Sequence, residues 1–289
     1  MRRMFIFGLG YTAGRLAHTL RRDGWQVDAT GRAGDLAFDD DEAVRSALAR
    51  ADSVLSSVPP DRDNGSDPVL TRYGDALAGR WLGYLSSTGV YGDTAGAWVD
   101  ESAPLADSPR ARCDAAWLAR GARVFRLPGI YGAGRSALDR VREGRAHRID
   151  LPGQVFSRVH VHDIVAGVTA ALACEAPPGA YNLADDLPCS QNRVVEHACR
   201  LLGVMPPPLQ TMDEAGLRAM ARGFYAANRR VANDRAKRVF GWRPRYPTFA
   251  EGLAALMDGA SAGTDFALSA TTIPATASTP PATANGDQR

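Results

Sequence analysis

The sequence predicts an α/β protein built around a doubly wound parallel sheet, and three observations near its start support this fold class. Residues 4–7 are all apolar and run directly into a glycine cluster at residues 8–14. An apolar pattern with helical spacing follows at Leu16 and Leu20. Residues 25–30 then have the composition of a second strand. A strand, a crossover helix and a parallel strand within about 30 residues have the size of a βαβ unit.

The glycine cluster matches the template G-x-G-x-x-A of a dinucleotide site. Gly8 would make the tight turn, Gly10 would let a pyrophosphate approach the backbone, and Ala13 would let helix and strand pack closely. The helix N-terminus would offer free N–H groups and a partial positive charge to the phosphates. We include Tyr11 and Thr12, at the start of this helix, in the predicted cofactor site.

The end of the second strand distinguishes NADP from NAD. NAD sites usually carry an acidic residue there, which holds the ribose hydroxyls. This chain has Arg32 instead, and Asp28 lies inside the strand. Because a guanidinium suits a phosphate, the sequence favours NADP, with NAD as second choice. Asp39 either caps a helix or faces the adenine ring.

Ligands of such sheets bind outside the carboxyl ends of the strands. Residues 53–58 form a further buried strand, which Pro59 ends, so Val58 and Pro59 are predicted to line the cofactor site. Three more elements are expected, a short strand at residues 36–38, a helix at residues 68–77 and a strand at residues 81–86.

Composition argues against two classes of partner. A net charge of +2 over 289 residues gives no basic footprint for nucleic acid. No apolar run approaches the roughly 20 residues that span a bilayer. The four cysteines have no C-x-x-C spacing, which indicates reduced thiols. We therefore expect a cytoplasmic protein, a monomer or homodimer, that binds neither nucleic acid nor a membrane.

Four later segments carry a specific resemblance. They are SSTGVYG at residues 86–92, RLPGIYG at residues 126–132, RVHVHDI at residues 158–164 and YNLA at residues 181–184. Their order and content resemble the extended short-chain dehydrogenase/reductase superfamily, the NAD-dependent epimerase/dehydratase group. The resemblance covers roughly residues 3–257. It implies a Rossmann-type core and a smaller C-terminal α+β lobe that binds the substrate.

The resemblance also implies catalytic residues, and only part of the set is present. Ser87 matches the serine that hydrogen-bonds the substrate oxygen. The Tyr-x-x-x-Lys pair that should follow is replaced by Arg110 and Asp114. Lys237 is the only lysine, and Asn233 stands four residues before it, so no such pair exists anywhere in the chain. This departure is similar to the atypical branch of the superfamily.

The missing lysine matters because an unperturbed tyrosine has a pKa of about 10 and is a poor base at neutral pH. Two interpretations of the replacements remain open. Arg110 can polarise a carbonyl while Asp114 pairs with it at i, i+4, or the two form an ordinary ion pair on an exposed helix.

Other polar residues are weaker candidates. The loop at residues 126–132 would place Pro128 and Ile130 beside the nicotinamide, with Tyr131 either at the cofactor mouth or in the packing. His160 and His162 would share one face of a strand, as proton shuttles or as buried structural residues. No further ligand cluster supports a metal site.

We expect residues 1–175 to form the NAD(P)-binding domain and residues 176–258 the substrate lobe. Helices are predicted at residues 163–173, 190–202, 213–222 and 250–257. The basic segment at residues 229–235 either binds an anionic substrate or forms a solvated face. Residues 259–289 are rich in Ala, Thr, Ser, Gly and Pro, and are predicted to be disordered.

Two functions follow as hypotheses. The first is an NAD(P)-dependent oxidoreductase or epimerase/dehydratase that acts on a small polar, sugar-nucleotide-like substrate, with Ser87 orienting it. The second is a non-catalytic NAD(P)-binding sensor or regulatory protein, which the missing Tyr-x-x-x-Lys pair supports.

Overall fold

The computed structural model describes residues 1–217 and 219–259, and its centre is a six-stranded sheet in which every neighbouring pair is parallel. In order across the sheet the strands are β10 (Gly179–Asn182), β6 (Arg123–Leu127), β4 (Trp81–Ser87), β3 (Ser53–Ser56), β1 (Arg3–Phe7) and β2 (Gln26–Ala29). The predicted doubly wound parallel sheet is confirmed.

The connections reverse direction between β1 and β3. From β1 the chain moves to β2 at one edge, returns to β3, and then continues toward the other edge. Ligands of open α/β sheets bind at such a switch point, outside the carboxyl ends of the strands. The glycine loop follows β1, so the fold places this loop at the expected crevice.

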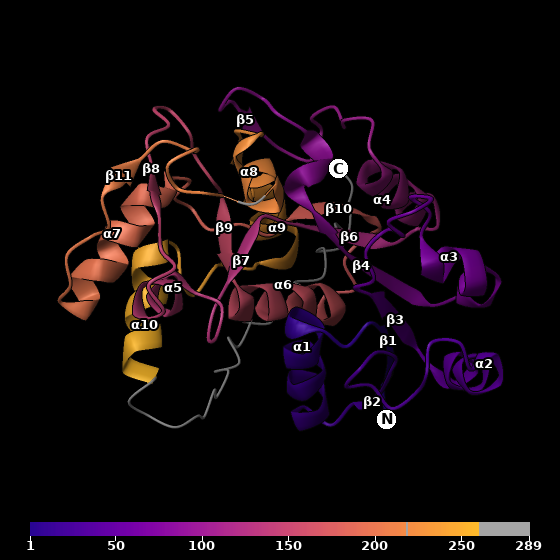
Figure 1. Cartoon of the computed structure of the whole chain (residues 1–289). Helices are drawn as coiled ribbons and strands as arrows, with labels where there is room; N and C mark the ends of the chain where they lie inside the picture. Colours follow the sequence, from indigo (N-terminus) through magenta and orange to yellow (C-terminus); the bar gives the residue numbers. More distant parts are fainter. Residues whose placement is uncertain (218, 260–289) are drawn as a thin grey trace, which may run out of the picture.

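Helices cover both faces of the sheet, as Figure 1 shows. One face carries α1 (Tyr11–Arg22), α6 (Val161–Ala173) and α9 (Asp234–Phe240), and the other carries α2 (Asp41–Arg50), α3 (Pro68–Tyr73) and α4 (Pro109–Ala119). Alternation along β1 explains the layers. Met4 and Ile6 pack on the first face, and Phe5 and Phe7 pack on the second.

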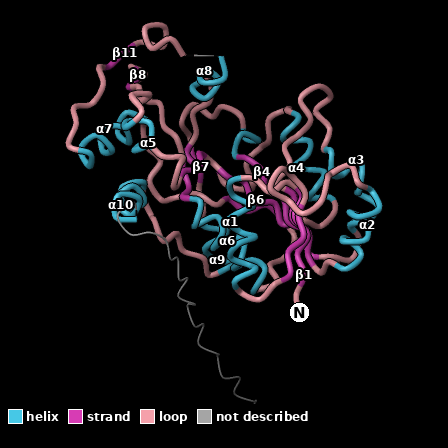
Figure 2. Tube along the Cα trace, turned by 60° about the horizontal axis from the view of Figure 1, so that its bottom comes forward, coloured by secondary structure: helices cyan, strands magenta, loops and turns pink. Residues whose placement is uncertain are grey.

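A smaller α+β part is built from short paired strands and four helices. The strand pairs are β7 (Gly129–Tyr131) with β9 (Arg158–His160), β8 (Arg148–Ile149) with β11 (Leu209–Gln210), and β5 (Trp98–Val99) with β12 (Arg230–Val231). The helices are α5 (Ala137–Arg142), α7 (Gln191–Leu202), α8 (Ala219–Tyr225) and α10 (Phe249–Gly259). Figures 1 and 2 show α5, α7 and α10 together, away from α2 and α3, and these three helices share a separate apolar core.

The two parts do not follow each other simply in sequence. β10 comes after residue 175 and pairs with β6 in the large sheet, whereas β7, α5, β8 and β9 come before it. The domain boundary at residue 175 therefore stays a prediction. None of the helices in the described residues is long and apolar enough to cross a membrane.

Several predicted elements differ in detail. The strand expected at residues 36–38 is a single bridge between Thr30 and Leu36. The helix expected at residues 68–77 changes to a 3₁₀ turn, η1 (Gly74–Leu77), after α3. The helix expected at residue 213 begins only at α8, after a run of turns. The predicted disordered tail lies, from residue 260 onward, outside the described residues.

Candidate active site

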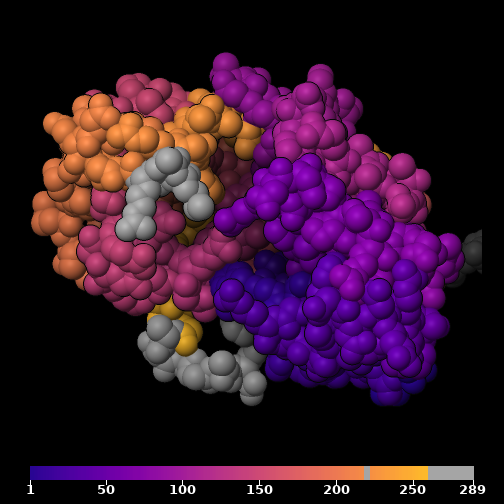
Figure 3. Space-filling model, turned by 45° about the vertical axis from the view of Figure 1, so that its right-hand side comes forward, coloured from indigo at the N-terminus to yellow at the C-terminus, as the bar shows by residue number. Residues whose placement is uncertain are grey.

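A cavity of about 1850 Å³ opens at the carboxyl ends of the sheet strands and extends into the smaller part. In Figure 3 the surface is hollowed between the indigo N-terminal part and the orange C-terminal part. Nine of the predicted site residues line this cavity: Gly10, Tyr11, Thr12, Ala13, Pro59, Ser87, Arg110, Pro128 and Ile130. Five predicted residues do not line it: Gly8, Arg32, Asp39, Val58 and Asp114.

The glycine loop fits a phosphate group. Gly10 is the N-cap of α1, no side chain caps this helix, and its first turn carries no acidic residue. A Cβ at Gly10 would find nothing within 4 Å, so the backbone faces open space. Gly8 instead shapes the turn, because its φ is +84° and a Cβ there would lie 2.9 Å from Ser57 Oγ.

The end of β2 passes directly against the glycine loop. Gly31 has φ +119°, and a Cβ there would lie 2.9 Å from the backbone nitrogen of Leu9. Arg32 follows, exposed and without an ion-pair partner in the described part of the chain. Asp39 is also exposed. Val58 packs against the apolar core rather than lining the cavity.

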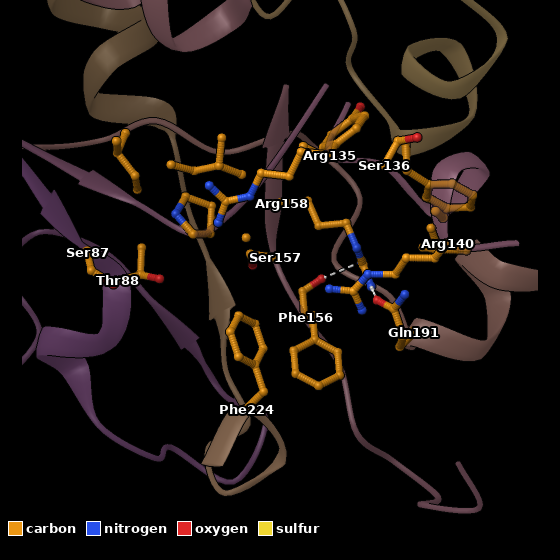
Figure 4. A pocket seen from close by; sticks show the side chains of 18 of the residues that line it. Ser87, Thr88, Arg135, Ser136, Arg140, Phe156, Ser157, Arg158, Gln191 and Phe224 are labelled. Carbon is orange, nitrogen blue, oxygen red and sulfur yellow. Dashed lines mark hydrogen bonds between the residues drawn. The ribbon is translucent and has the colours of Figure 1, made fainter. Parts of the chain in front are cut away.

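Ser87 is the last residue of β4 and caps the 3₁₀ turn η2 (Thr88–Tyr91). Its Oγ accepts a hydrogen bond from the Gly89 N–H at 3.1 Å. The hydroxyl proton is then available to a ligand in the cavity. Figure 4 shows Ser87 and Thr88 together at one side of the cavity.

The predicted pairing of Arg110 with Asp114 is wrong. Asp114 is fully buried and accepts hydrogen bonds from Arg126 at 2.8 and 3.1 Å and from Ser86 at 2.7 Å. Arg110 lines the cavity and donates to the Tyr84 hydroxyl at 3.3 Å. Neither sequence-based interpretation holds for Asp114, because a buried guanidinium on β6 binds its carboxylate on the inner face of α4.

The remaining candidate acids and bases are directed elsewhere or remain neutral. The Tyr131 hydroxyl donates to the Thr248 carbonyl at 3.4 Å, toward α10. β9 ends at His160, so His162 lies in α6 rather than on the same strand face. Burial lowers the pKa of His160 to about 3 and that of His162 to about 4, so both are neutral near pH 7. No three His, Cys, Asp or Glu side chains of the described residues are grouped to hold a metal ion.

The smaller part gives the cavity a basic wall. The basic residues that line it there are Arg135, Arg140, Arg145, His147, Arg158 and Arg229. The two carboxylates nearby are engaged, Asp139 by Ser136 at 2.7 Å and Glu143 by Arg145. This wall therefore suits an anionic ligand. Within the basic segment at residues 229–235, Arg229 lines the cavity, whereas Arg235 stacks on Tyr181 with its guanidinium 5.0 Å from the ring centre.

Comparison with known proteins identifies relatives of this chain. A solved structure of a functionally unknown conserved protein from Silicibacter pomeroyi is 40% identical, covers 89% of this chain and 99% of its own, and superimposes with a TM-score of 0.78. The chain belongs to the same family as this protein. No family model matches the chain.

Other solved structures define the fold. dTDP-glucose 4,6-dehydratase from Bacillus anthracis, in complex with NAD, is 16% identical with a TM-score of 0.72 and covers 90% of this chain and 97% of its own. A human epimerase family protein with NADPH is 17% identical with a TM-score of 0.70 and covers 89% of this chain and 99% of its own. This chain has the fold of the NAD-dependent epimerase/dehydratase group.

Two curated proteins are similar in sequence. The 3-diazoavenalumate denitrifying reductase of a Streptomyces species is 33% identical over 141 residues, and the match spans 45% of this chain and 45% of the reductase. Protein YeeZ of Escherichia coli is 27% identical over 86% of this chain and 97% of its own.

In this chain the pair Asp114–Arg126 belongs to a buried network that the sequence did not predict. Arg126 also donates to the Tyr91 hydroxyl at 3.0 Å, and this hydroxyl donates to Asn182 Oδ1 at 2.8 Å. Burial raises the pKa of Tyr91, which keeps its proton. Arg126, Tyr91 and Asn182 each lie in one of the motif segments that carry the family resemblance. Their presence in these segments was the only feature of the sequence that could have indicated the network. The network joins β4, η2, α4, β6 and β10 beneath Ser87.

Proposed function

We propose that this protein is an NAD(P)-dependent oxidoreductase or epimerase/dehydratase-like enzyme that acts on a small polar substrate. One observation carries the proposal: the uncapped N-terminus of α1 at Gly10 and the hydroxyl of Ser87 face the same cavity. A dinucleotide that extends through this cavity from the start of α1 would place its nicotinamide at Ser87.

The cofactor would be held by the chain's own residues in three places. The N–H groups at the start of α1 would bind the pyrophosphate, and Pro128 and Ile130 would line the nicotinamide end. Arg32 supports NADP over NAD, because its unpaired guanidinium follows the strand that ends beside the glycine loop. When bound, this cofactor supplies or accepts a hydride.

The residues around the substrate would orient it and stabilise charge. Ser87 would donate its hydroxyl proton in a hydrogen bond to the substrate oxygen. The Arg110 guanidinium offers only N–H donors, so it can stabilise negative charge on that oxygen but cannot serve as a base. Asp114, held by Arg126, has no role in proton transfer. The similarity of part of this chain to a reductase from Streptomyces supports a reduction.

The second candidate is a non-catalytic NAD(P)-binding sensor or regulatory protein. It is favoured by one specific observation: two candidate bases of the site are engaged away from Ser87, because Asp114 is buried in its ion pair with Arg126 and the Tyr131 hydroxyl donates toward α10.

Oxidation of NADPH separates the two candidates. We expect saturating protein to oxidise NADPH in the presence of carbonyl compounds, followed by absorbance at 340 nm. Ser87→Ala should lower kcat/KM at least tenfold, whereas Ser46→Ala, on exposed α2, should not change it. Binding of NADPH without any oxidation over a broad panel of carbonyl compounds and sugar nucleotides would favour the sensor.

A further inference from the structure

Aromatic side chains form a wall on the side of the cavity that the smaller part supplies. The rings of Phe156 and Phe224 lie 6.3 Å apart, and Tyr225 meets Phe156 edge-on at 5.5 Å. Phe224 is 65% exposed on α8 and lines the cavity. An apolar ring exposed inside a polar cavity gains most from a ligand that covers it.

The position of Phe156 is fixed by the backbone. Its N–H donates to the Cys189 carbonyl at 2.9 Å, and the Cys189 N–H donates back at 3.2 Å. Arg158 reinforces this bridge, since it donates to the carbonyls of Phe156 and Cys189 at 2.9 and 3.1 Å and to Gln191 Oε1 at 3.1 Å. Arg158 is buried, and these bonds make it a positioning residue for the aromatic wall.

Arg140 is the cation available beside this wall. It is exposed on α5, lines the cavity, and makes no side-chain hydrogen bond or ion pair with the described residues. Both Arg140 and Arg158 lie near enough to lower the pKa of the Tyr225 hydroxyl, although burial raises it overall. Figure 4 shows Arg140 and Arg158 beside Phe156, across the cavity from Ser87 and Thr88.

The other arginines of the wall are either engaged by other groups or directed toward the glycine loop. Arg145 pairs with Glu143, and Arg229 donates to the Gly92 carbonyl. Arg135 lies 5.6 Å from the ring of Tyr11, on the side of the glycine loop. The Arg140 guanidinium beside Phe156 matches a single acid group on a planar ring, because a guanidinium binds one carboxylate in a bidentate manner.

We propose that the substrate is a planar conjugated acid, whose ring lies against Phe156 and Phe224 and whose carboxylate binds Arg140. The opposite end of the molecule then points toward Ser87. This inference rests on the proposed function, since only a cofactor at the glycine loop makes the ligand a substrate. The proposed acid differs from a sugar nucleotide, whose diphosphate would need a second cation beside the aromatic wall.

Calorimetric titration of the NADP-saturated protein tests the proposal with four probes: trans-cinnamate, the neutral cinnamamide, the non-planar cyclohexanecarboxylate and UDP-glucose. We expect trans-cinnamate to bind at least tenfold more tightly than the other three. Arg140→Gln should weaken the binding of trans-cinnamate at least tenfold and should change the binding of cinnamamide little. Arg142→Gln, on the same helix but outside the cavity wall, should change neither.

The aromatic wall is tested in the same titration. Phe224→Ala should weaken the binding of trans-cinnamate several-fold. This variant should fold normally, because Phe224 is exposed. Met205→Ala, which removes an 89% exposed side chain outside the cavity, is the control. Tighter binding of UDP-glucose than of trans-cinnamate, or unchanged binding in Arg140→Gln, would overturn the proposal.

Failure of the proposed function gives a different result. If NADPH and NADP cause no thermal stabilisation, the proposed function fails, and the substrate assignment fails with it. If they stabilise the protein and trans-cinnamate does not bind, only the substrate assignment fails.

Discussion

Asp114 and Arg126 form a two-bond ion pair, at 2.8 and 3.1 Å, with both side chains almost completely buried. Asp114 stands where the resemblance to active dehydrogenases expects a lysine. The site therefore has a guanidinium held below Ser87 instead of an ammonium group beside the cofactor. A buried charge without its partner is costly, so this pair is a structural element of the site.

Removing one member of this pair should destabilise the protein strongly. We expect Asp114→Ala to lower the free energy of unfolding by about 3–5 kcal/mol, because Arg126 is left buried and unpaired. Urea denaturation at pH 7 measures this loss of unfolding free energy. Asp213→Ala removes an exposed ion pair with Arg222 and should cost less than about 1 kcal/mol. Equal losses in the two variants would contradict the structural role of Asp114.

Arg32 should determine the choice between the two dinucleotides. We expect Arg32→Ala to weaken NADP binding about ten- to a hundredfold, since a charged hydrogen-bond pair to the 2′-phosphate is lost, and to leave NAD binding unchanged. Fluorescence titration with each dinucleotide measures this. Arg50→Ala, on the exposed face of α2, is the control. If both dinucleotides weaken equally or neither changes, Arg32 has no phosphate role.

Asp185 should make stability depend on pH. Its carboxyl is buried, its Oδ2 has no hydrogen-bond partner in the described residues, and burial raises its pKa to about 8. The folded pKa lies above the unfolded value, so the contribution of Asp185 to stability is complete below about pH 4 and is lost as pH rises to 8.

We therefore expect Asp185→Asn to become more stable than the natural protein as pH rises from 4 to 8, by a few kcal/mol in order of magnitude. Urea denaturation at pH 5 and pH 8 measures the difference. Asp150→Asn, an exposed acid, should show no such trend. A stability difference that stays constant between the two pH values would refute the burial effect.

Local patterns in the sequence predicted the fold and the part of the cavity formed by the glycine loop and Ser87. The apolar run, the glycines and the helical spacing are contiguous, so residues 4–20 specify β1, the loop and α1 without tertiary information. Ser87 was found because residues 86–92, which begin at the end of a buried strand, resemble the motif of the superfamily. These features depend on neighbours in sequence, which is why one chain is enough to identify them.

The rest of the site depends on contacts between distant elements. Asp114 was expected to pair within its own helix, but β6 lies against α4 and supplies Arg126. Phe156 and Phe224 come from different segments of the smaller part, and no motif connects them. Nothing in the sequence around Arg140 distinguishes it from other helical arginines, and only the structure shows that it lines the cavity without an ion pair among the described residues.

The claim that the cofactor's pyrophosphate lies on Gly10 can be tested by one pair of alanine variants. A Cβ at Gly10 or at Gly14 has nothing within 4 Å, but only Gly10 lines the cavity. Both variants should fold, and Gly14→Ala should gain about 0.5–1 kcal/mol from the helix interior.

The decisive measurement is the thermal stabilisation of the natural protein and these two variants by NADPH. A ligand at a hundred times its Kd should stabilise the natural protein and Gly14→Ala by about 2.7 kcal/mol. Gly10→Ala should lose most of this stabilisation, because its methyl group occupies the place of the pyrophosphate. Full stabilisation of Gly10→Ala by NADPH would contradict the account.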